Sequence, residues 1–263
     1  MASDMGSEEV SAAQTEENPG PPLSTKVHSP RERKLIILLL LLLTICAAWV
    51  NMLAFLSLGQ VFASFMTGNF LFIGVGLIQG SHTLLIRAII AVGLYLVSIT
   101  LSSLFLGHVP EPETPLSRLH RFVRFLVPEW FFLLGFALLW QFTSDLNHNN
   151  GVQITLLCIA VFAMGIQGVL VQKLDFPGVI VNALTGTEIL LGRRLAQDTI
   201  VHRTWWRNTW FLAAQCVAYI VSAILVVLTM RSFAVQFVPL IVVTIALCVL
   251  MIFRYREKKL PGE

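Results

Sequence analysis

The sequence is 263 residues long, and 56% of its residues are hydrophobic while only 13% are charged. Soluble domains carry about 25% charged residues, so this composition excludes an ordinary soluble protein and indicates an integral membrane protein. The net charge is only +3, and the basic residues cluster beside apolar runs, which is typical of contact with lipid headgroups and argues against a nucleic-acid partner.

The N-terminal region is predicted to be a disordered tail. Residues 1–30 are rich in Ser, Glu, Pro, Gly and Ala, and they cannot bury enough apolar surface to offset the entropy of ordering. The tail ends in the basic flank RERK, so we set its boundary at residue 34. The first apolar run begins at Leu35 and lacks a small-residue cleavage site, which indicates a retained span instead of a signal peptide.

Eight apolar segments follow the tail. They lie at 35–56, 61–79, 84–106, 126–143, 152–171, 178–195, 208–229 and 235–253. Backbone groups in lipid must be satisfied within the segment, and these runs are too uniformly apolar for outer-membrane strands. The predicted fold class is therefore an all-α polytopic membrane helix bundle. We assign residues 35–253 to this membrane domain and residues 254–263 to a basic C-terminal tail.

The segments repeat within the chain. A shift of 118 positions superposes Val61 on Val179, Thr67 on Thr185, Gly68 on Gly186, Gly74 on Gly192 and Leu77 on Leu195. Chance matches are easy among Leu and Val, but less so for two Thr-Gly pairs that each have a Gly six positions later. We therefore expect two four-segment repeats, at about 35–143 and 152–253, with a functional site at their interface.

Two topologies fit this pattern. With eight spans, 13 of the 18 Lys and Arg residues lie on the inner side. With six full spans and two broken or re-entrant Thr-Gly segments, 16 lie inside, which the positive-inside rule favours. Length favours eight spans, since each Thr-Gly segment has about 18 largely apolar residues and could just cross. Both span numbers are even, so both termini are predicted to be cytoplasmic, and we expect a plasma-membrane location.

The two Thr-Gly segments, FMTGNFLFIGVGL and ALTGTEILLGRRL, place hydrogen-bonding and helix-breaking residues inside apolar runs. Irregular backbone at membrane depth is tolerated where it lines a watery cavity or is packed in protein. A substrate site and tight packing by small residues are therefore both open. The candidate substrate or ion site comprises Thr67, Gly68, Asn69, Thr185, Gly186, Thr187 and Glu188, together with Asn51 and Gln167 from other spans.

Glu188 is the most informative member of this set. It follows Thr187 in an otherwise apolar run, where a carboxylate costs a few kcal/mol unless it is paired, protonated or hydrated. We interpret it as a proton or cation site, or as the partner of an Arg, and we expect it to point into the protein. The alternative is a Glu near a helix break that reaches towards Arg193 and Arg194.

Motifs for catalysis, metals and cofactors are missing from the sequence. The Cys residues show no CxxC spacing, the His residues show no HExxH spacing, and neither a phosphate loop nor a GxSxG elbow occurs. We therefore expect no catalytic residue, no metal, no cofactor and no enzymatic activity.

The stretches FLSLGQVFASFMTGNFLFIGVGL, AMGIQGVLVQKL and ALTGTEILLG resemble the YoaK-like family of integral membrane proteins, domain-of-unknown-function family 1275. The resemblance covers roughly residues 35–253. It implies a membrane protein but little mechanism, since the function of the family is unsettled. The family pattern has an acid in the first span where this chain has Asn51, which puts any charge-dependent role of that position in question and makes Glu188 a candidate substitute.

Two functions remain open. We favour a small-molecule or ion transporter or channel, in which Met66–Phe70 and Leu184–Glu188 approach each other near the membrane midplane. The alternative is a non-enzymatic membrane scaffold, assembly factor or partner subunit in which the same residues only pack. A transporter should be hydrated at these residues, whereas a scaffold should be dry there. The expected partners are the lipid bilayer and a small solute or ion.

Overall fold

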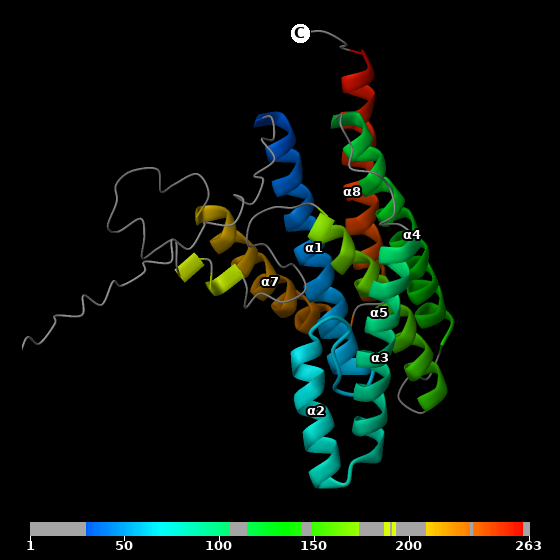
Figure 1. Cartoon of the computed structure of the whole chain (residues 1–263). Helices are drawn as coiled ribbons and strands as arrows, with labels where there is room; N and C mark the ends of the chain where they lie inside the picture. Colours follow the sequence, from blue (N-terminus) through cyan, green and yellow to red (C-terminus); the bar gives the residue numbers. More distant parts are fainter. Residues whose placement is uncertain are drawn as a thin grey trace, which may run out of the picture.

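The computed structural model describes residues 30–105, 115–143, 149–173, 187–189, 191–192, 209–231 and 234–259. Within these ranges every regular element is a helix, which confirms the predicted all-α class (Figure 1). The helices are α1 Pro30–Ser57, α2 Met66–Gln79, α3 His82–Phe105, α4 Pro115–Phe142, α5 Asn150–Lys173, α7 Thr209–Thr229, the short η3 Val235–Phe237 and α8 Val238–Lys259.

Six of the described helices are long and apolar enough to cross a membrane, namely α1, α3, α4, α5, α7 and α8. The chain is thus a multi-pass helical membrane protein. α2 has only 14 residues, and at about 1.5 Å per residue it is too short for a hydrocarbon core about 30 Å thick. The second apolar segment is shortened because residues 58–65 form a loop, in which Gly59 and Gln60 have positive φ. Of the sixth segment, 178–195, only residues 187–189 and 191–192 are described.

Two helices extend beyond the predicted membrane domain. α1 begins at Pro30, so RERK, which was expected in the tail, is helical. Proline suits the first turn because its missing N–H would be unpaired there, and Glu32 lies at the positive end of the helix. α8 continues to Lys259, where basic residues from Arg254 onward lie at the negative end of the helix.

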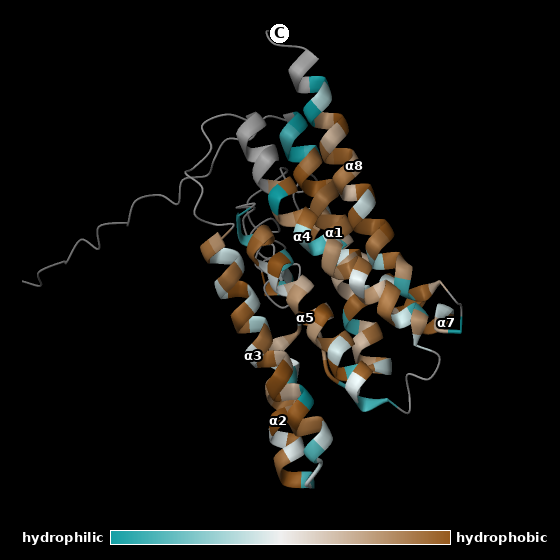
Figure 2. Cartoon of the chain, turned by 90° about the vertical axis from the view of Figure 1, so that its right-hand side faces the viewer, coloured by the Kyte–Doolittle hydropathy of each residue, from teal (hydrophilic) through white to brown (hydrophobic). Residues whose placement is uncertain are grey.

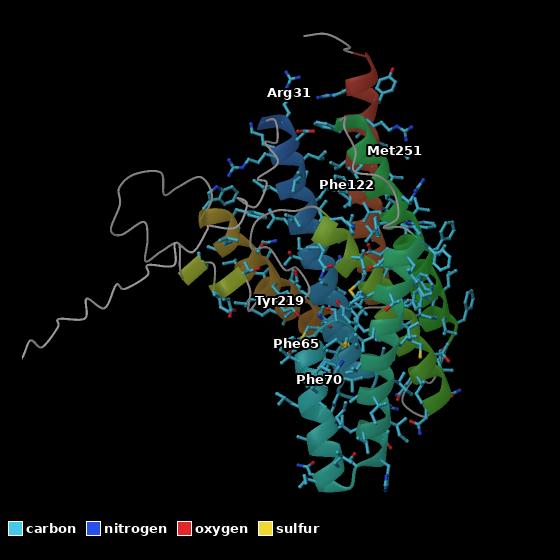
Figure 3. The ribbon with its side chains drawn as sticks, in the orientation of Figure 1. Arg31, Phe65, Phe70, Phe122, Tyr219 and Met251 are labelled. Carbon is cyan, nitrogen blue, oxygen red and sulfur yellow. The ribbon has the colours of Figure 1, made fainter. Side chains whose placement is uncertain are left out.

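Basic residues gather at one end of the bundle. The start of α1, the start of α4 and the end of α8 lie there, as the positions of Arg31, Phe122 and Met251 show (Figure 3). Hydrophilic residues mark this end, whereas the helices are mostly hydrophobic along their length (Figure 2). The basic residues with described side chains that these three helix ends contribute are Arg31, Arg33, Lys34, Arg124, Arg254 and Arg256.

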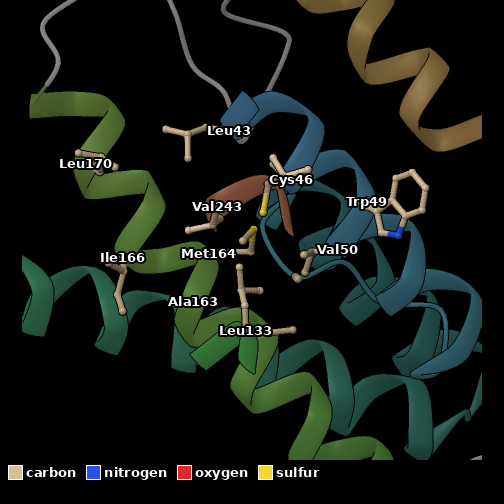
Figure 4. Packing of buried hydrophobic residues seen from close by; sticks show 14 of the residues in the cluster. Leu43, Cys46, Trp49, Val50, Leu133, Ala163, Met164, Ile166, Leu170 and Val243 are labelled. Atoms are coloured by element: carbon tan, nitrogen blue, oxygen red, sulfur yellow. The ribbon is translucent and has the colours of Figure 1, made fainter. Parts of the chain in front are cut away.

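α1 is the central helix. It packs against α5, α7 and α8, and the five consecutive residues Cys46–Val50 are buried, so every side of it is covered. Figure 4 shows Cys46 in an apolar core with Met164 of α5, Leu133 of α4 and Val243 of α8. Polar groups near the middle of α1 are therefore shielded from lipid by other helices.

α2 and α3 form a hairpin that packs on α5 through α3. The turn between them contains Gly80 with a φ of +68°, the left-handed conformation that ends many helices. α3 approaches α5 closely, since the Ser98 hydroxyl donates to the Phe162 carbonyl at 2.7 Å and any Cβ on Gly165 would overlap Ser98. This packing holds the start of α3 against the start of α5.

Candidate functional site

The first Thr-Gly segment forms the start of α2, where it packs against the loop between α1 and α2. Asn69 is fully buried, and its Nδ2 donates to the Phe62 carbonyl at 2.8 Å while its Oδ1 accepts from the Phe62 N–H at 2.9 Å. A Cβ on Gly68 would lie 2.7 Å from the Phe65 ring. Thr67, by contrast, is exposed. Asn69 and Gly68 therefore hold the loop against α2, which favours the packing interpretation for this segment.

Asn69→Ala is expected to destabilise the protein, because it leaves the N–H and the carbonyl of Phe62 without partners. Each buried polar group that loses its partner costs about 1–3 kcal/mol. Thermal unfolding of the purified protein measures this loss, and Thr67→Ala is the matched control because Thr67 is exposed two residues away. Equal melting temperatures for the two variants would contradict the structural role of Asn69.

Asn51 ties α1 to the same loop and to α7. Its Nδ2 donates to Ser64 Oγ at 2.7 Å and to the Tyr219 hydroxyl at 3.2 Å. Its Oδ1 accepts from the Ser64 N–H at 2.9 Å. The polar atoms of Asn51 are therefore engaged inside the protein, and its observed role is to join three elements.

The second Thr-Gly segment is described only in part. Thr185 and Gly186 lie outside the described residues, and so does most of the stretch expected to approach Met66–Phe70. Thr187 is buried, but Glu188 is exposed, although its carboxylate is close enough to Cys216 of α7 to interact with it electrostatically. The expectation that Glu188 points into the protein is thus wrong. Neighbouring helical residues lie about 100° apart, so the buried side of Thr187 turns Glu188 outward.

Glu129, which was not among the predicted site residues, is a fully buried acid of the bundle. It lies at the middle of the 28-residue helix α4 and has no exposed surface. Neither of its carboxyl oxygens has a hydrogen-bond partner in the described part of the chain. Pro128 precedes it and has no N–H, so the carbonyl of Arg124 loses its helical partner one turn earlier. A carboxyl group in such surroundings must be neutral or must acquire a partner.

α4 packs on α5 and α8, and Glu129 reaches from it towards α1. Its carboxyl is close enough to Cys46 of α1 for an electrostatic interaction. The next residue, Trp130, donates from Nε1 to Thr244 Oγ1 of α8 at 2.8 Å. α4 is therefore fixed to α8 beside the carboxyl, and Glu129 faces the central helix.

Two glutamines reach the same turn of α1. Gln167 of α5 donates from Nε2 to the Leu43 carbonyl at 3.0 Å, and Gln215 of α7 donates to Thr44 Oγ1 at 3.3 Å. The Oε1 atoms of both glutamines are buried without partners among the described residues. We call Glu129, Gln167 and Gln215 the acceptor cluster, because their unpartnered atoms are all oxygens and the three side chains approach residues 43–46 of α1 from α4, α5 and α7. No bond joins the three to one another in the described part of the chain. Such oxygens can take a proton, a cation or a solute that carries hydrogen-bond donors.

The acceptor cluster contains only one of the predicted site residues, Gln167. Asn51 and Asn69 are engaged at the α1–α2 loop instead. Glu129 was not predicted as a site residue, because the sequence does not show whether this acid is buried. Its signal was nevertheless present, since it is an acid inside the apolar segment 126–143.

Comparisons with known proteins confirm the family resemblance. A family model described as "Protein of unknown function (DUF1275)" matches residues 39–253. The UPF0700 transmembrane protein YoaK of Bacillus subtilis (strain 168) is 28% identical over 200 residues, which make up 74% of this chain and 84% of that protein. No solved structure gives a significant match.

Proposed function

Because the chain belongs to the DUF1275 family of proteins of unknown function, we propose from its geometry that it transports a small solute or ion and that the acceptor cluster is its site. One observation carries the proposal: Glu129 is fully buried within a spanning helix, and its carboxyl has no partner in the described ranges. This site keeps Gln167 from the sequence-based hypothesis and replaces Glu188 with Glu129 as the acid on which transport depends.

The cost of Glu129 argues for a role beyond packing. An ionised carboxylate in apolar surroundings costs several kcal/mol, and a neutral carboxyl still loses its hydrogen bonds to water. A Leu of similar size would fill the same space without this cost. We therefore infer that Glu129 takes up a proton or cation in one state of a transport cycle and releases it in another.

The proposal treats the two halves of the bundle as inverted repeats. In this relation α1 corresponds to α5, α3 to α7 and α4 to α8. The observed helix pairs agree with it, since α3 packs on α5 as α7 packs on α1. In the same way, α4 packs on α5 as α8 packs on α1. Three spans in each half reverse the direction of the second half. Inverted repeats commonly place a transport site at their interface, and Gln167 meets Leu43 where α5 contacts α1.

Hydrogen bonds support the same relation between the halves. The bond from Ser98 to Phe162 joins α3 to α5, and the bond from Gln215 to Thr44 joins α7 to α1. The 118-residue shift relates Thr44 to Phe162 directly, and it relates Ser98 to the position next to Gln215. The two halves therefore use corresponding positions to hold corresponding helices together.

The basic end of the bundle is proposed to face the cytoplasm, in accordance with the positive-inside rule. We expect reporters fused to either terminus to lie inside the cell, and a reporter inserted between α4 and α5 to lie outside. Protease access in sealed and in permeabilised cells measures these positions. Terminal reporters on opposite sides of the membrane would contradict an even number of spans.

Transport itself is tested with the purified protein in liposomes. A pH-sensitive dye inside the vesicles reports proton movement while amino acids, sugars, organic acids and alkali cations are added outside in turn. We expect one class to produce a flux that neither empty vesicles nor vesicles with the Glu129→Gln protein show. If no class produces flux and none raises the melting temperature, the scaffold or partner-subunit alternative replaces transport.

A further inference from the structure

We infer that Arg87 forms part of a binding site for an oxyanion, a carboxylate or phosphate group, at the start of α5. Arg87 is the sixth residue of α3 and is only 6% exposed. Its Nη2 donates to Asn150 Oδ1 at 3.0 Å and to Gln153 Oε1, whereas its Nε is buried without a partner. Both acceptors belong to neutral amides, and no acid pairs with Arg87 within the described residues.

A second positive group lies at the same place. α5 has 24 residues, begins at Asn150 and has no acidic residue in its first turn. The N-terminus of such a helix carries a partial positive charge that favours anions, and here Asn149 Oδ1 caps it by accepting from the Val152 N–H at 3.2 Å. The guanidinium of Arg87 is held against this turn through Asn150 and Gln153, so a full and a partial positive charge meet, and no acid among the described residues pairs with Arg87. A bound anion would remove this repulsion.

The loop between α1 and α2 leaves room for the guanidinium. Gly59 has a φ of +99°, and any Cβ there would overlap the Arg87 head group. The next residue, Gln60, is exposed, and so is Asn150 on the α5 side, so the site borders on the surface of the protein. The free Nε–H offers an oxyanion a charge-assisted hydrogen bond, and the planar guanidinium suits oxyanions because its N–H groups are arranged in parallel.

The oxyanion has two possible sources, a free solute and the phosphate of an anionic lipid. In the first arm of the test, inorganic phosphate and acetate are titrated into the detergent-purified protein at constant ionic strength, and thermal unfolding is followed. In the second arm, native mass spectrometry counts the phosphatidylglycerol molecules retained from mixed phosphatidylcholine nanodiscs. Stabilisation in the first arm identifies a solute site, and selective retention in the second identifies a lipid site.

Three variants decide the outcome. Arg87→Gln is expected to abolish the response, whereas Arg231→Gln, which removes an exposed Arg at the α7–α8 turn, should respond like the wild type. Arg87→Lys keeps the charge and serves as the test if Arg87→Gln fails to fold. It should weaken binding by about tenfold, which corresponds to the loss of about one charge-assisted hydrogen bond. The inference is overturned if phosphate, acetate and phosphatidylglycerol all fail to bind the wild type. It is also overturned if the anion that binds the wild type binds the Arg87 variants equally tightly. These readouts do not require flux, so they are independent of the transport proposal.

Discussion

Vesicles that contain the Glu129→Gln protein are expected to show only background flux. Gln has nearly the same size and can still form hydrogen bonds, but it cannot exchange a proton or carry a negative charge. The buried position of Glu129 should therefore make this change selective for coupling. The measurement is proton movement in liposomes, compared at equal amounts of folded protein.

Glu188→Gln is the matched control for this variant, since Glu188 is exposed. It should keep wild-type flux. Glu129→Leu should abolish flux as well, but it should raise the free energy of unfolding by about 1–3 kcal/mol, because an unsatisfied buried polar group disappears. Unchanged flux in Glu129→Gln, or loss of flux in Glu188→Gln alone, would remove Glu129 from the mechanism.

Gly165→Leu is expected to have the largest effect on stability. Any Cβ on Gly165 would overlap Ser98, so a Leu must push α3 away from α5 and break the bond from Ser98 to the Phe162 carbonyl. Overpacking of this kind costs about 1–3 kcal/mol or more, and interfaces between membrane helices depend on such small residues. Thermal unfolding of the purified protein measures the cost.

Gly93→Leu tests whether the effect depends on the interface. Gly93 is also on a spanning helix, but it is exposed and a Cβ there meets no atom within 4 Å. A Leu at this position should be tolerated, and it should even favour the helix because Gly is a poor helix former. Similar melting temperatures for the two Leu variants would show that α3 and α5 do not pack as closely as the structure describes.

The helices were predictable because their signal is strong. Long apolar runs bounded by charges give the six spanning helices to within several residues of their observed ends, except where α4 starts at Pro115 and α8 ends at Lys259. Those extensions are amphipathic or charged, and hydropathy alone does not predict them. The short length of α2 was not predictable either. The loop at 58–65 is as apolar as a helix, and it is held by hydrogen bonds to Asn51 and Asn69, which lie outside it in the sequence.

The candidate site was less predictable, because burial depends on neighbours that are distant in sequence. The sequence predicted a substrate or ion site at Thr67, Gly68 and Asn69. In the structure Asn69 instead closes a local loop, and Thr67 is exposed. Glu188 and Glu129 are both acids near apolar segments, and only the packing of α4 against α5 and α8 shows that Glu129 is the buried one. A sequence gives the chemistry of a side chain, but not the direction in which a helix turns it.

The most direct test asks whether the core beside Glu129 opens to water, using Cys46 as the probe. Cys46 is fully buried next to Glu129, and replacing Cys158, Cys216 and Cys248 with Ala leaves it as the sole thiol. A small membrane-impermeant thiol reagent is applied to this protein in sealed liposomes. The transport account predicts that Cys46 is modified in the folded protein and that modification blocks flux. A Cys46 that stays unmodified until the protein is unfolded would contradict an interior site that exchanges with water.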